Sequence, residues 1–420
     1  MVHRKLQEIL NCRTALPVAD ANPPILNQSE RKKSSMILIS LFIRKVWNLS
    51  PKQKQCLQTN LLVSRCGAIS MRASLEAWIH RQWAKRGLLA FALSPFSLVF
   101  LLIARLRRRR TTPIKLPVPT IVVGNIYVGG TGKTPVTIAL VRQLVALGWH
   151  PGIVSRGYAS SGNSTRLVSE NSTAKEVGDE PLLIYQATKC PVAVNKDRVS
   201  AAKVLLKTNP AIDVIISDDG LQHLRLDRDV EIAVVGARGL GNGWVLPAGP
   251  LREPASRLDS VDAVVLNATD ETLATRTPRF AATSQLGQIV QLATGRIEAI
   301  NRISETIKTN QWKTQALAGI ALPDRFFSML RAHDIDCTGI RLPDHFDFSE
   351  NPFKSVDADM IFITGKDAVK CRQIPEIAQD TRIWVADLEM VLDQFLIDFI
   401  VEKITQVQDK EVPTNGHALD

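Results

Sequence analysis

The sequence predicts an α/β protein with a doubly wound, mainly parallel sheet and a second, smaller α/β domain. Short apolar runs rich in Val and Ile recur near residues 121, 153, 192, 214, 232 and 264 and alternate with helix-length segments. Further apolar runs at 361–366 and 382–385, followed by an amphipathic stretch at 391–400, predict the smaller domain. We expect a basic extension over 1–74, a membrane-interface helix over 75–110, the larger domain over 111–300, the smaller domain over 301–406 and a tail over 407–420.

The composition is that of a globular but basic protein. The chain has 420 residues, 45% of them hydrophobic, and a formal net charge of +11. This charge favours an anionic partner, and nucleic acid, an anionic membrane or a phosphorylated substrate would each satisfy it. The six cysteines form no C-x-x-C pair, which indicates a reducing compartment and no zinc site.

Residues 1–74 contain twelve Lys or Arg and only three acidic residues, together with many serines. This composition is typical of an organelle transit segment. A disordered basic tail would have the same composition, so both interpretations stay open. Met36 and Met71 are internal starts that would shorten the segment.

Residues 75–110 have the features of a membrane-binding segment. Trp78 and Trp83 precede an apolar run of 17 residues, 88–104, and arginines crowd the following positions 105–110. The run is short for a span and is interrupted by Pro95, so we expect a helix or helix pair in the membrane interface. One transmembrane helix and a buried core helix are the alternatives. Arginines beside an apolar run argue against a nucleic-acid site.

The segment 119–134 predicts a phosphate-binding loop between a buried strand and a helix. An apolar run at 121–123 leads into three glycines and a lysine, and a helix-length segment follows over 134–147. Tyr127 stands where the G-x-x-x-x-G-K-[ST] pattern has its first glycine, so a glycine turn with an incidental lysine is the alternative. The nucleotide-binding residues that we predict are Gly129, Gly130, Thr131, Gly132, Lys133 and Thr134.

Two adjacent acids supply the second half of this site. Asp218 and Asp219 directly follow the apolar run 211–216, where a strand of a parallel sheet would end at the ligand crevice. There a carboxylate can hold Mg²⁺ opposite Thr134, as in P-loop nucleoside triphosphatases and kinases. The alternative is a solvated acidic turn.

The segments after the acid pair help to separate classes of nucleotide-binding protein. A signalling GTPase would need D-x-x-G and N-K-x-D, and the chain has SDDG at 217–220 and NATD at 267–270, so the guanine motif fails. A loop rich in Gly and Pro, 239–254, predicts close backbone approach to a ligand. We predict that Arg252 stabilises the negative charge of the transferred phosphoryl group in the transition state. Glu253 is a further candidate metal ligand.

Eight ordered motifs between residues 75 and 404 resemble those of the tetraacyldisaccharide 4′-kinase family, the lipid A 4′-kinases. They are GGTGKTP at 129–135, SRGY at 155–158, GDEP at 178–181, DDGLQH at 218–223, GNG at 241–243, LPAGPLREP at 246–254, PDRFF at 323–327 and DHF at 344–346. The resemblance implies a P-loop fold and a kinase that uses ATP and Mg²⁺ to phosphorylate the 4′-hydroxyl of a tetraacylated glucosamine disaccharide 1-phosphate. It also implies a membrane-surface partner and no nucleic acid; we expect a monomer.

The resemblance implies a catalytic base as well. In the family the aspartate of G-D-E-P, here Asp179, is thought to take the sugar hydroxyl proton together with the histidine of D-H-[FY], here His345. The catalytic residues that we predict are Asp179, His345, Lys133 and Arg252, and the metal-binding residues are Thr134, Asp218, Asp219 and Glu253. Without the resemblance, an acid at 179 or 180 predicts only a helix cap, and a lone histidine predicts a surface or core residue.

The chain departs from the family pattern at Ala159, Gly236 and Leu322, where Gly, Asp and Arg are common. We expect these departures to leave the nucleotide and base positions untouched. They keep open an ATP-binding, membrane-associated protein with impaired catalysis; a small-molecule P-loop kinase is a further alternative. The front extension and the resemblance to plant members of the family predict a mitochondrial location, with the plastid, or the inner face of a bacterial cytoplasmic membrane, as alternatives.

Overall fold

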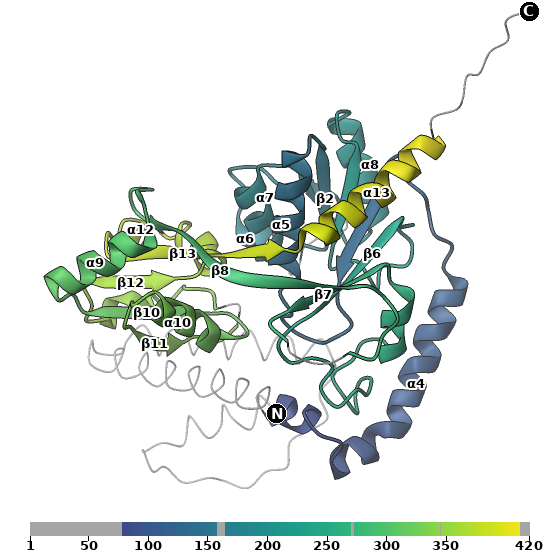
Figure 1. Cartoon of the computed structure of the whole chain (residues 1–420), viewed down its shortest axis with the longest axis horizontal. Helices are drawn as coiled ribbons and strands as arrows, with labels where there is room; N and C mark the ends of the chain where they lie inside the picture. The colour runs from purple at the N-terminus through teal and green to yellow at the C-terminus, as the bar shows by residue number, and fades with distance from the viewer. Residues whose placement is uncertain (1–77, 158–163, 270–272, 345, 412–420) are drawn as a thin grey trace, which may run out of the picture. The chain divides into compact units, whose positions relative to one another are not determined.

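The computed structural model describes residues 78–157, 164–269, 273–344 and 346–411, and Figure 1 shows their arrangement. The predicted extension 1–74, Ala159, His345 and most of the predicted tail lie outside the described residues. The α-helices are α4 (Leu88–Arg110), α5 (Lys133–Ala146), α6 (Ala174–Val177), α7 (Asp179–Thr188), α8 (Arg198–Thr208), α9 (Ile300–Asn310), α10 (Pro323–Ala332), α11 (Gly365–Cys371), α12 (Pro375–Ala378) and α13 (Gln394–Glu411). Two short 3-10 helices are η1 (Ala255–Ser260) and η2 (Pro352–Ser355).

The strands form one continuous sheet of thirteen strands. They are β1 (Thr120–Gly124), β2 (Pro151–Ser155), β3 (Arg166–Leu167), β4 (Val192–Val194), β5 (Val214–Asp218), β6 (Val230–Val235), β7 (Ala263–Asn267), β8 (Arg279–Gln291), β9 (Ile297–Glu298), β10 (Thr314–Ala318), β11 (Thr338–Arg341), β12 (Met360–Ile363) and β13 (Ile383–Leu392). Their order is β11-β10-β12-β13-β8-β7-β6-β1-β5-β2-β4-β3, and β9 pairs with β8. The six strands predicted for the larger domain are present as β1, β2, β4, β5, β6 and β7.

The first block of the sheet is parallel from β4 to β8, with β1 between β5 and β6. All five residues of β1 are buried, because helices cover both faces of this block. On one face α5, α7 and α13 pack on the sheet, and on the other face α8 and a cluster around η1 do so. This confirms the doubly wound, mainly parallel fold.

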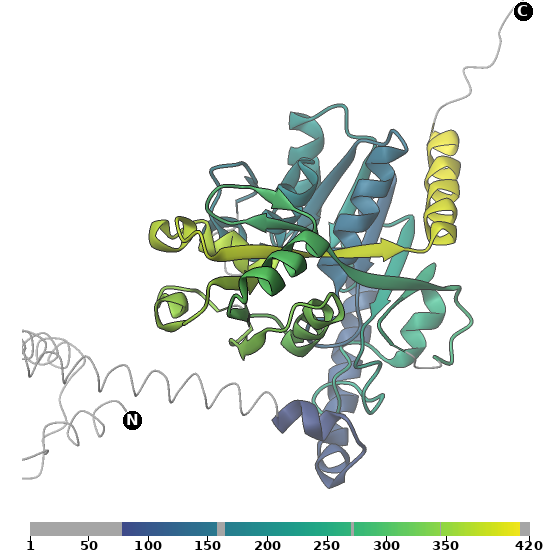
Figure 2. The same cartoon turned by 60° about the vertical axis from the view of Figure 1, so that its left-hand side comes forward.

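The second block is the parallel set β11, β10, β12 and β13, with α9 and α10 on one face and α11, α12 and η2 on the other. The long strand β13 runs antiparallel to β8, so the strand direction reverses where the two blocks meet. Figure 2 shows these two strands crossing the middle of the structure. The sheet therefore continues through the predicted boundary at residue 300, and the division into two domains stays a prediction.

Two predicted elements of the second block differ from the structure. The strand expected over 361–366 ends at Ile363, because the Thr364 side chain caps a new helix by accepting from the backbone N–H of Asp367. The helix expected over 391–400 begins only at Gln394, since Val391 and Leu392 still pair with β8. It then continues to Glu411.

The apolar segment forms one helix, α4, which continues through Pro95 instead of breaking into a pair. Of its side chains only Ala90 and Ser97 are buried, so the alternative of a buried core helix is wrong. The Ser97 hydroxyl donates to the Val245 carbonyl at 2.9 Å and accepts from the backbone N–H of Ala248 at 3.1 Å. In the described part of the chain, α4 is long and apolar enough to cross a membrane. Apart from the contacts around Ser97 and Ala90, most apolar side chains of α4 stay exposed.

Candidate active site

The phosphate-binding loop lies between β1 and α5, as the sequence predicts. Gly129 and Gly132 adopt φ values of +116° and +89°, which only glycine accepts without strain. A Cβ on Gly132 would lie 2.1 Å from the Asn267 side-chain amide nitrogen, so the loop has no room for any other residue there. Because α5 begins at Lys133, its first backbone N–H groups have no intrahelical acceptor and are available to an anion at the cavity.

Asp218 lies beside this loop because β5 pairs with β1 and places Asp218 opposite Val123. Its side chain is fully buried. One carboxylate oxygen accepts from the Thr137 hydroxyl at 3.0 Å, and the other, Oδ2, has no hydrogen-bond partner among the described residues. Burial, and then the neighbouring carboxylates of Glu180 and Asp219, raise the pKa of Asp218 to about 7.

Asp219 is held by cations. Its Oδ1 lies 3.7 Å from the Lys133 ammonium and 3.4 Å from the Arg252 guanidinium. Burial alone would raise the pKa of Asp219, but the charges of Lys133 and Arg252 outweigh it and the pKa is lowered. Asp219 therefore stays ionised beside the loop.

These residues fit a hard divalent cation. An unpartnered buried carboxylate oxygen on Asp218, the Asp219 carboxylate and the Thr134 hydroxyl are the oxygen ligands that Mg²⁺ prefers. Three protein oxygens leave further positions for phosphate oxygens and water, as is usual for Mg²⁺ at a nucleotide. Their assignment as ligands stays a prediction.

The other residues assigned to phosphate or metal lie in two different surroundings. Arg252 lines the cavity and donates to Asp219 and Gln222. Glu253 does not line it: one of its oxygens accepts from the Gln222 amide at 2.7 Å and the other lies 3.2 Å from Arg257 Nε. Glu253 thus holds its neighbours in place, and its metal role stays a prediction.

The Gly- and Pro-rich loop packs against the segment leading to α4, and its predicted contact with a ligand stays a prediction. Its residues 239–251 do not line the cavity. They pack against the segment leading to α4, since the backbone N–H of Asn242 donates to the Trp83 carbonyl and Trp83 Nε1 donates to the Pro247 carbonyl. Phe91 packs edge-on against Trp244 at 5.1 Å. The glycines allow this close packing, and only Arg252 reaches the cavity.

Asp179 is the first residue of α7, and Gly178, with φ +95°, occupies the N-cap position. Asp179 and Glu180 therefore lie in the first helical turn and do not cap the helix. Asp179 Oδ2 forms an ion pair of 2.7 Å with Lys370, and both side chains are largely buried. His345 lies outside the described residues, so its pairing with Asp179 stays a prediction.

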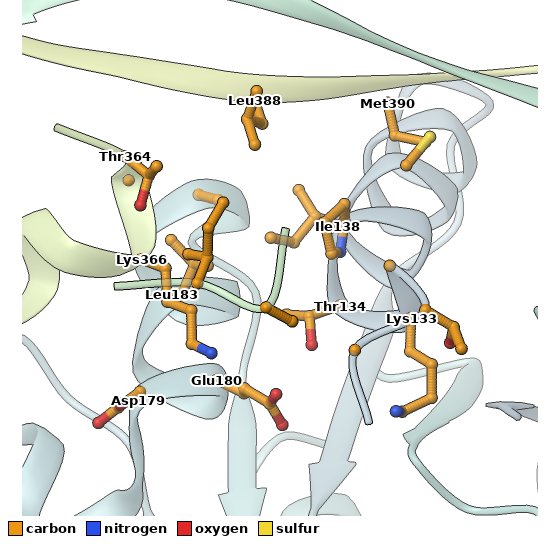
Figure 3. A pocket seen from close by; sticks show the side chains of 18 of the residues that line it. Lys133, Thr134, Ile138, Asp179, Glu180, Leu183, Thr364, Lys366, Leu388 and Met390 are labelled. Atoms are coloured by element: carbon orange, nitrogen blue, oxygen red, sulfur yellow. The ribbon is translucent and has the colours of Figure 1, made fainter. Parts of the chain in front are cut away.

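A single cavity of about 1590 Å³ joins most of these groups, although neither Asp218 nor Glu253 lines it. It is lined by the glycine loop, Asp219, Arg252, Asp179 and part of α11. The close-up in Figure 3 shows Lys133, Thr134, Glu180 and Asp179 around this space. The structure thus brings the predicted nucleotide residues and the predicted base into one site.

Sequence reasoning missed several residues of the site. The Asn267 amide donates to the Thr131 carbonyl at 3.0 Å, and Arg325 donates to Asn267 Oδ1 at 3.1 Å. Arg325 belongs to the PDRFF motif at 323–327, which predicts no role by itself, and Asn267 opens the segment NATD at 267–270, which only indicates that a guanine motif is absent. Lys370 was missed because only the fold brings it to Asp179, and Glu180 because only the fold brings it near Asp218.

The expectation that the departures from the family pattern leave the nucleotide-binding positions untouched is wrong for Gly236. Gly236 lines the cavity, and a Cβ there would lie 2.9 Å from the Cα of Thr131 in the glycine loop. An aspartate at this position would force the loop to move. This departure from the family pattern therefore contacts the nucleotide-binding loop, and Leu322 also lines the cavity.

Over most of its length the chain is similar to proteins of one family. A family profile described as tetraacyldisaccharide-1-P 4′-kinase matches residues 89–405. The tetraacyldisaccharide 4′-kinase of Herminiimonas arsenicoxydans is 46% identical over an alignment of 348 residues, and the match covers 79% of this chain and 97% of that protein. That of Methylobacillus flagellatus is 40% identical over an alignment of 351 residues, and the match covers 81% of this chain and 100% of that protein. A crystal structure of LpxK from Aquifex aeolicus in complex with ATP is similar with a TM-score of 0.63 and 26% identity, covering 76% of this chain and all of that one.

Proposed function

Because the chain belongs to the tetraacyldisaccharide-1-P 4′-kinase family, we propose that it phosphorylates the 4′-hydroxyl of a tetraacylated glucosamine disaccharide 1-phosphate, with ATP as donor, in lipid A biosynthesis. One observation carries this proposal: the glycine loop, Asp219 and Asp179 line a single cavity, and the buried Asp218 lies next to the loop. A nucleotide and a sugar hydroxyl can therefore meet there.

In the proposed reaction the sugar hydroxyl gives its proton to Asp179 as its oxygen attacks the γ-phosphorus of ATP. The bond from the γ-phosphorus to the bridging oxygen breaks, and ADP leaves with that oxygen. Lys133 and Arg252, which both lie next to Asp219, compensate the negative charge on the phosphoryl oxygens. His345 sharing the proton with Asp179 is part of the proposal.

When bound, Mg²⁺ would neutralise charge on the β- and γ-phosphates, held by Thr134, Asp218 and Asp219. The structural support is the unpartnered Oδ2 of Asp218, which lies next to the loop. Thr137 donates to the other oxygen of Asp218 and so fixes the direction of the free one.

We propose that α4 binds the membrane that holds the substrate, and that the enzyme acts as a monomer. Apolar side chains along α4 are exposed, and its last turn carries Arg107–Arg110, which suit lipid phosphates. A co-sedimentation assay with anionic vesicles tests this. Deletion of 75–110 is expected to abolish binding, and unchanged partitioning would contradict a membrane role.

The location in the cell is also a proposal. The basic composition of residues 1–74 supports the mitochondrion, with the plastid as alternative. The relatives named above come from bacteria, which supports the inner face of a cytoplasmic membrane instead. Fluorescence localisation of the full chain beside a version starting at Met71 distinguishes these: equal distribution of the two would contradict a transit segment.

The catalytic proposal is tested by phosphate transfer from ATP to a tetraacyldisaccharide 1-phosphate. Lys133→Ala and Asp179→Ala are each expected to lower kcat by about 10²- to 10⁴-fold. Near-normal transfer by either variant would contradict its role. Wild-type protein that binds Mg-ATP but transfers no phosphate would support the alternative, a membrane-associated ATP-binding protein with impaired catalysis.

A further inference from the structure

Helix α11 is attached to the end of β10 by a buried carboxylate. Asp367 Oδ2 accepts from the Thr364 hydroxyl at 2.7 Å and from the backbone N–H of Gly319 at 3.1 Å. Asp367 is almost completely buried. These bonds fix the orientation of a helix of only seven residues, which could not hold its direction alone.

This orientation presents two lysines, one helical turn apart, to the cavity. Lys366 and Lys370 both line it, as expected for positions four residues apart on a helix. Lys366 Nζ lies 3.0 Å from Asp344 Oδ1. Lys370 Nζ lies 2.7 Å from Asp179 Oδ2 and donates to the Phe346 carbonyl at 2.9 Å.

Lys370 therefore joins three segments that are far apart in the sequence. Its own helix belongs to the second block of the sheet, Asp179 begins α7 in the first block, and Phe346 lies in the loop after β11. Arg372 strengthens the same junction by donating to the Gln186 side chain on α7 at 3.5 Å. The ion pair thus connects the two blocks of the sheet at Asp179, the proposed catalytic base.

We propose that Lys370 is a positioning residue for phosphoryl transfer, which holds the Asp179 carboxylate ionised and in place. This inference rests on the proposed function of Asp179 as the base. Lys370 contacts the carboxylate and not the reacting atoms, so it acts through Asp179.

Three physical features make this ion pair more than a surface contact. The side chains of Lys370 and Asp179 are 11% and 15% exposed, so water screens the pair little. The ammonium also donates to a backbone carbonyl, which restricts its position. The carboxylate at the start of α7 is further favoured in its ionised form by the helix dipole. A base that must accept a proton is then ready before the substrate binds.

The test is a steady-state and pH-rate study of Lys370→Met and Lys370→Gln in the full-length protein, with ATP and a tetraacyldisaccharide 1-phosphate. Loss of the ammonium is expected to lower kcat by roughly 30- to 100-fold, because a small displacement of a catalytic group has effects of this size. The KM for ATP should stay within about threefold, since the glycine loop is untouched. The acid limb of the pH-rate profile should move up by about one unit, because a nearby cation favours the carboxylate.

Lys354→Met is the matched control. Lys354 Nζ lies 2.7 Å from Glu376 Oε2, the same distance as in the Lys370 pair, but both side chains are more than two-thirds exposed and neither lines the cavity. This variant is expected to keep wild-type kcat and pH profile. Lys370→Arg should restore the position of the acid limb, because it keeps the charge.

The double variant Lys370→Met with Asp179→Asn decides whether Lys370 acts through the base. It should be no slower than Asp179→Asn alone. Additive losses, or a Lys370→Met variant within threefold of wild type, would overturn the inference while leaving the proposed function intact. A wild-type protein without transfer activity would instead contradict the proposed function, and this inference with it.

Discussion

The two walls of the cavity are built in different ways. The nucleotide wall, residues 129–134, comes from one contiguous segment, and its shape depends on backbone conformation and on the lack of space for a side chain at Gly132. The base wall, formed by Asp179, Lys366, Lys370 and Asp344, comes from three separate segments held by side-chain ion pairs. The first wall is fixed by backbone conformation and by close steric contact with Asn267, and the second depends on ion pairs between the two blocks of the sheet.

This comparison predicts that the nucleotide wall is the more sensitive to a single methyl group. Gly132→Ala should lower the affinity for Mg-ATP by at least about 100-fold, because the new Cβ meets both a φ of +89° and the Asn267 amide at 2.1 Å. Isothermal titration or a fluorescent ATP analogue measures the effect.

Gly148→Ala is the control for Gly132→Ala. Gly148 has nearly the same φ, +90°, but no atom lies within 4 Å of its added Cβ. It should therefore destabilise the fold by only about 1 kcal/mol and leave ATP affinity unchanged. If the two variants bind ATP equally well, the close fit of the loop is not what makes this wall sensitive.

A second prediction concerns the support behind the nucleotide wall. Arg325→Met should lower ATP affinity by about fivefold to tenfold, because Asn267 loses the partner that orients it toward the Thr131 carbonyl. Arg331→Met, on the exposed side of the same helix, is the matched control and should have no effect. A normal affinity in Arg325→Met would show that the loop holds its shape without α10.

The contrast between the walls also explains how far the sequence could be interpreted. The strands of the first block, and the positions of the glycine loop and the acid pair at strand ends, were predicted correctly, because each depends on a short local pattern of apolar, glycine and acidic residues. The binding roles of the loop and the acid pair stay predictions. The packing of the Gly- and Pro-rich loop against the segment leading to α4 was not predicted, because glycines permit close packing to a helix as readily as to a ligand. Lys370 and Asn267 could not be found, since nothing near them in the sequence indicates which distant group they meet. The continuity of the sheet depends on the long pairing of β8 with β13, for which apolar periodicity gives no register.

Near neutral pH the smallest effect is expected at the far end of the DDGLQH segment, where a histidine fixes the start of α8. His223 Nε2 accepts from the backbone N–H of Arg198 at 3.3 Å, and burial together with the charge of Arg198 lowers the pKa of His223 from 6.5 to about 4. The unfolded chain therefore takes up a proton near pH 6.5 that the folded chain refuses until about pH 4. The stability that depends on neutral His223 is complete above pH 6.5 and is lost as the pH falls toward 4, by at most about 3 kcal/mol. In His223→Gln, chemical unfolding followed by tryptophan fluorescence should show a shallower loss of stability over this interval, with a change below about 1 kcal/mol at pH 7.5. An equally steep loss of stability in the variant would mean that His223 does not anchor α8, and that other groups hold the start of this helix.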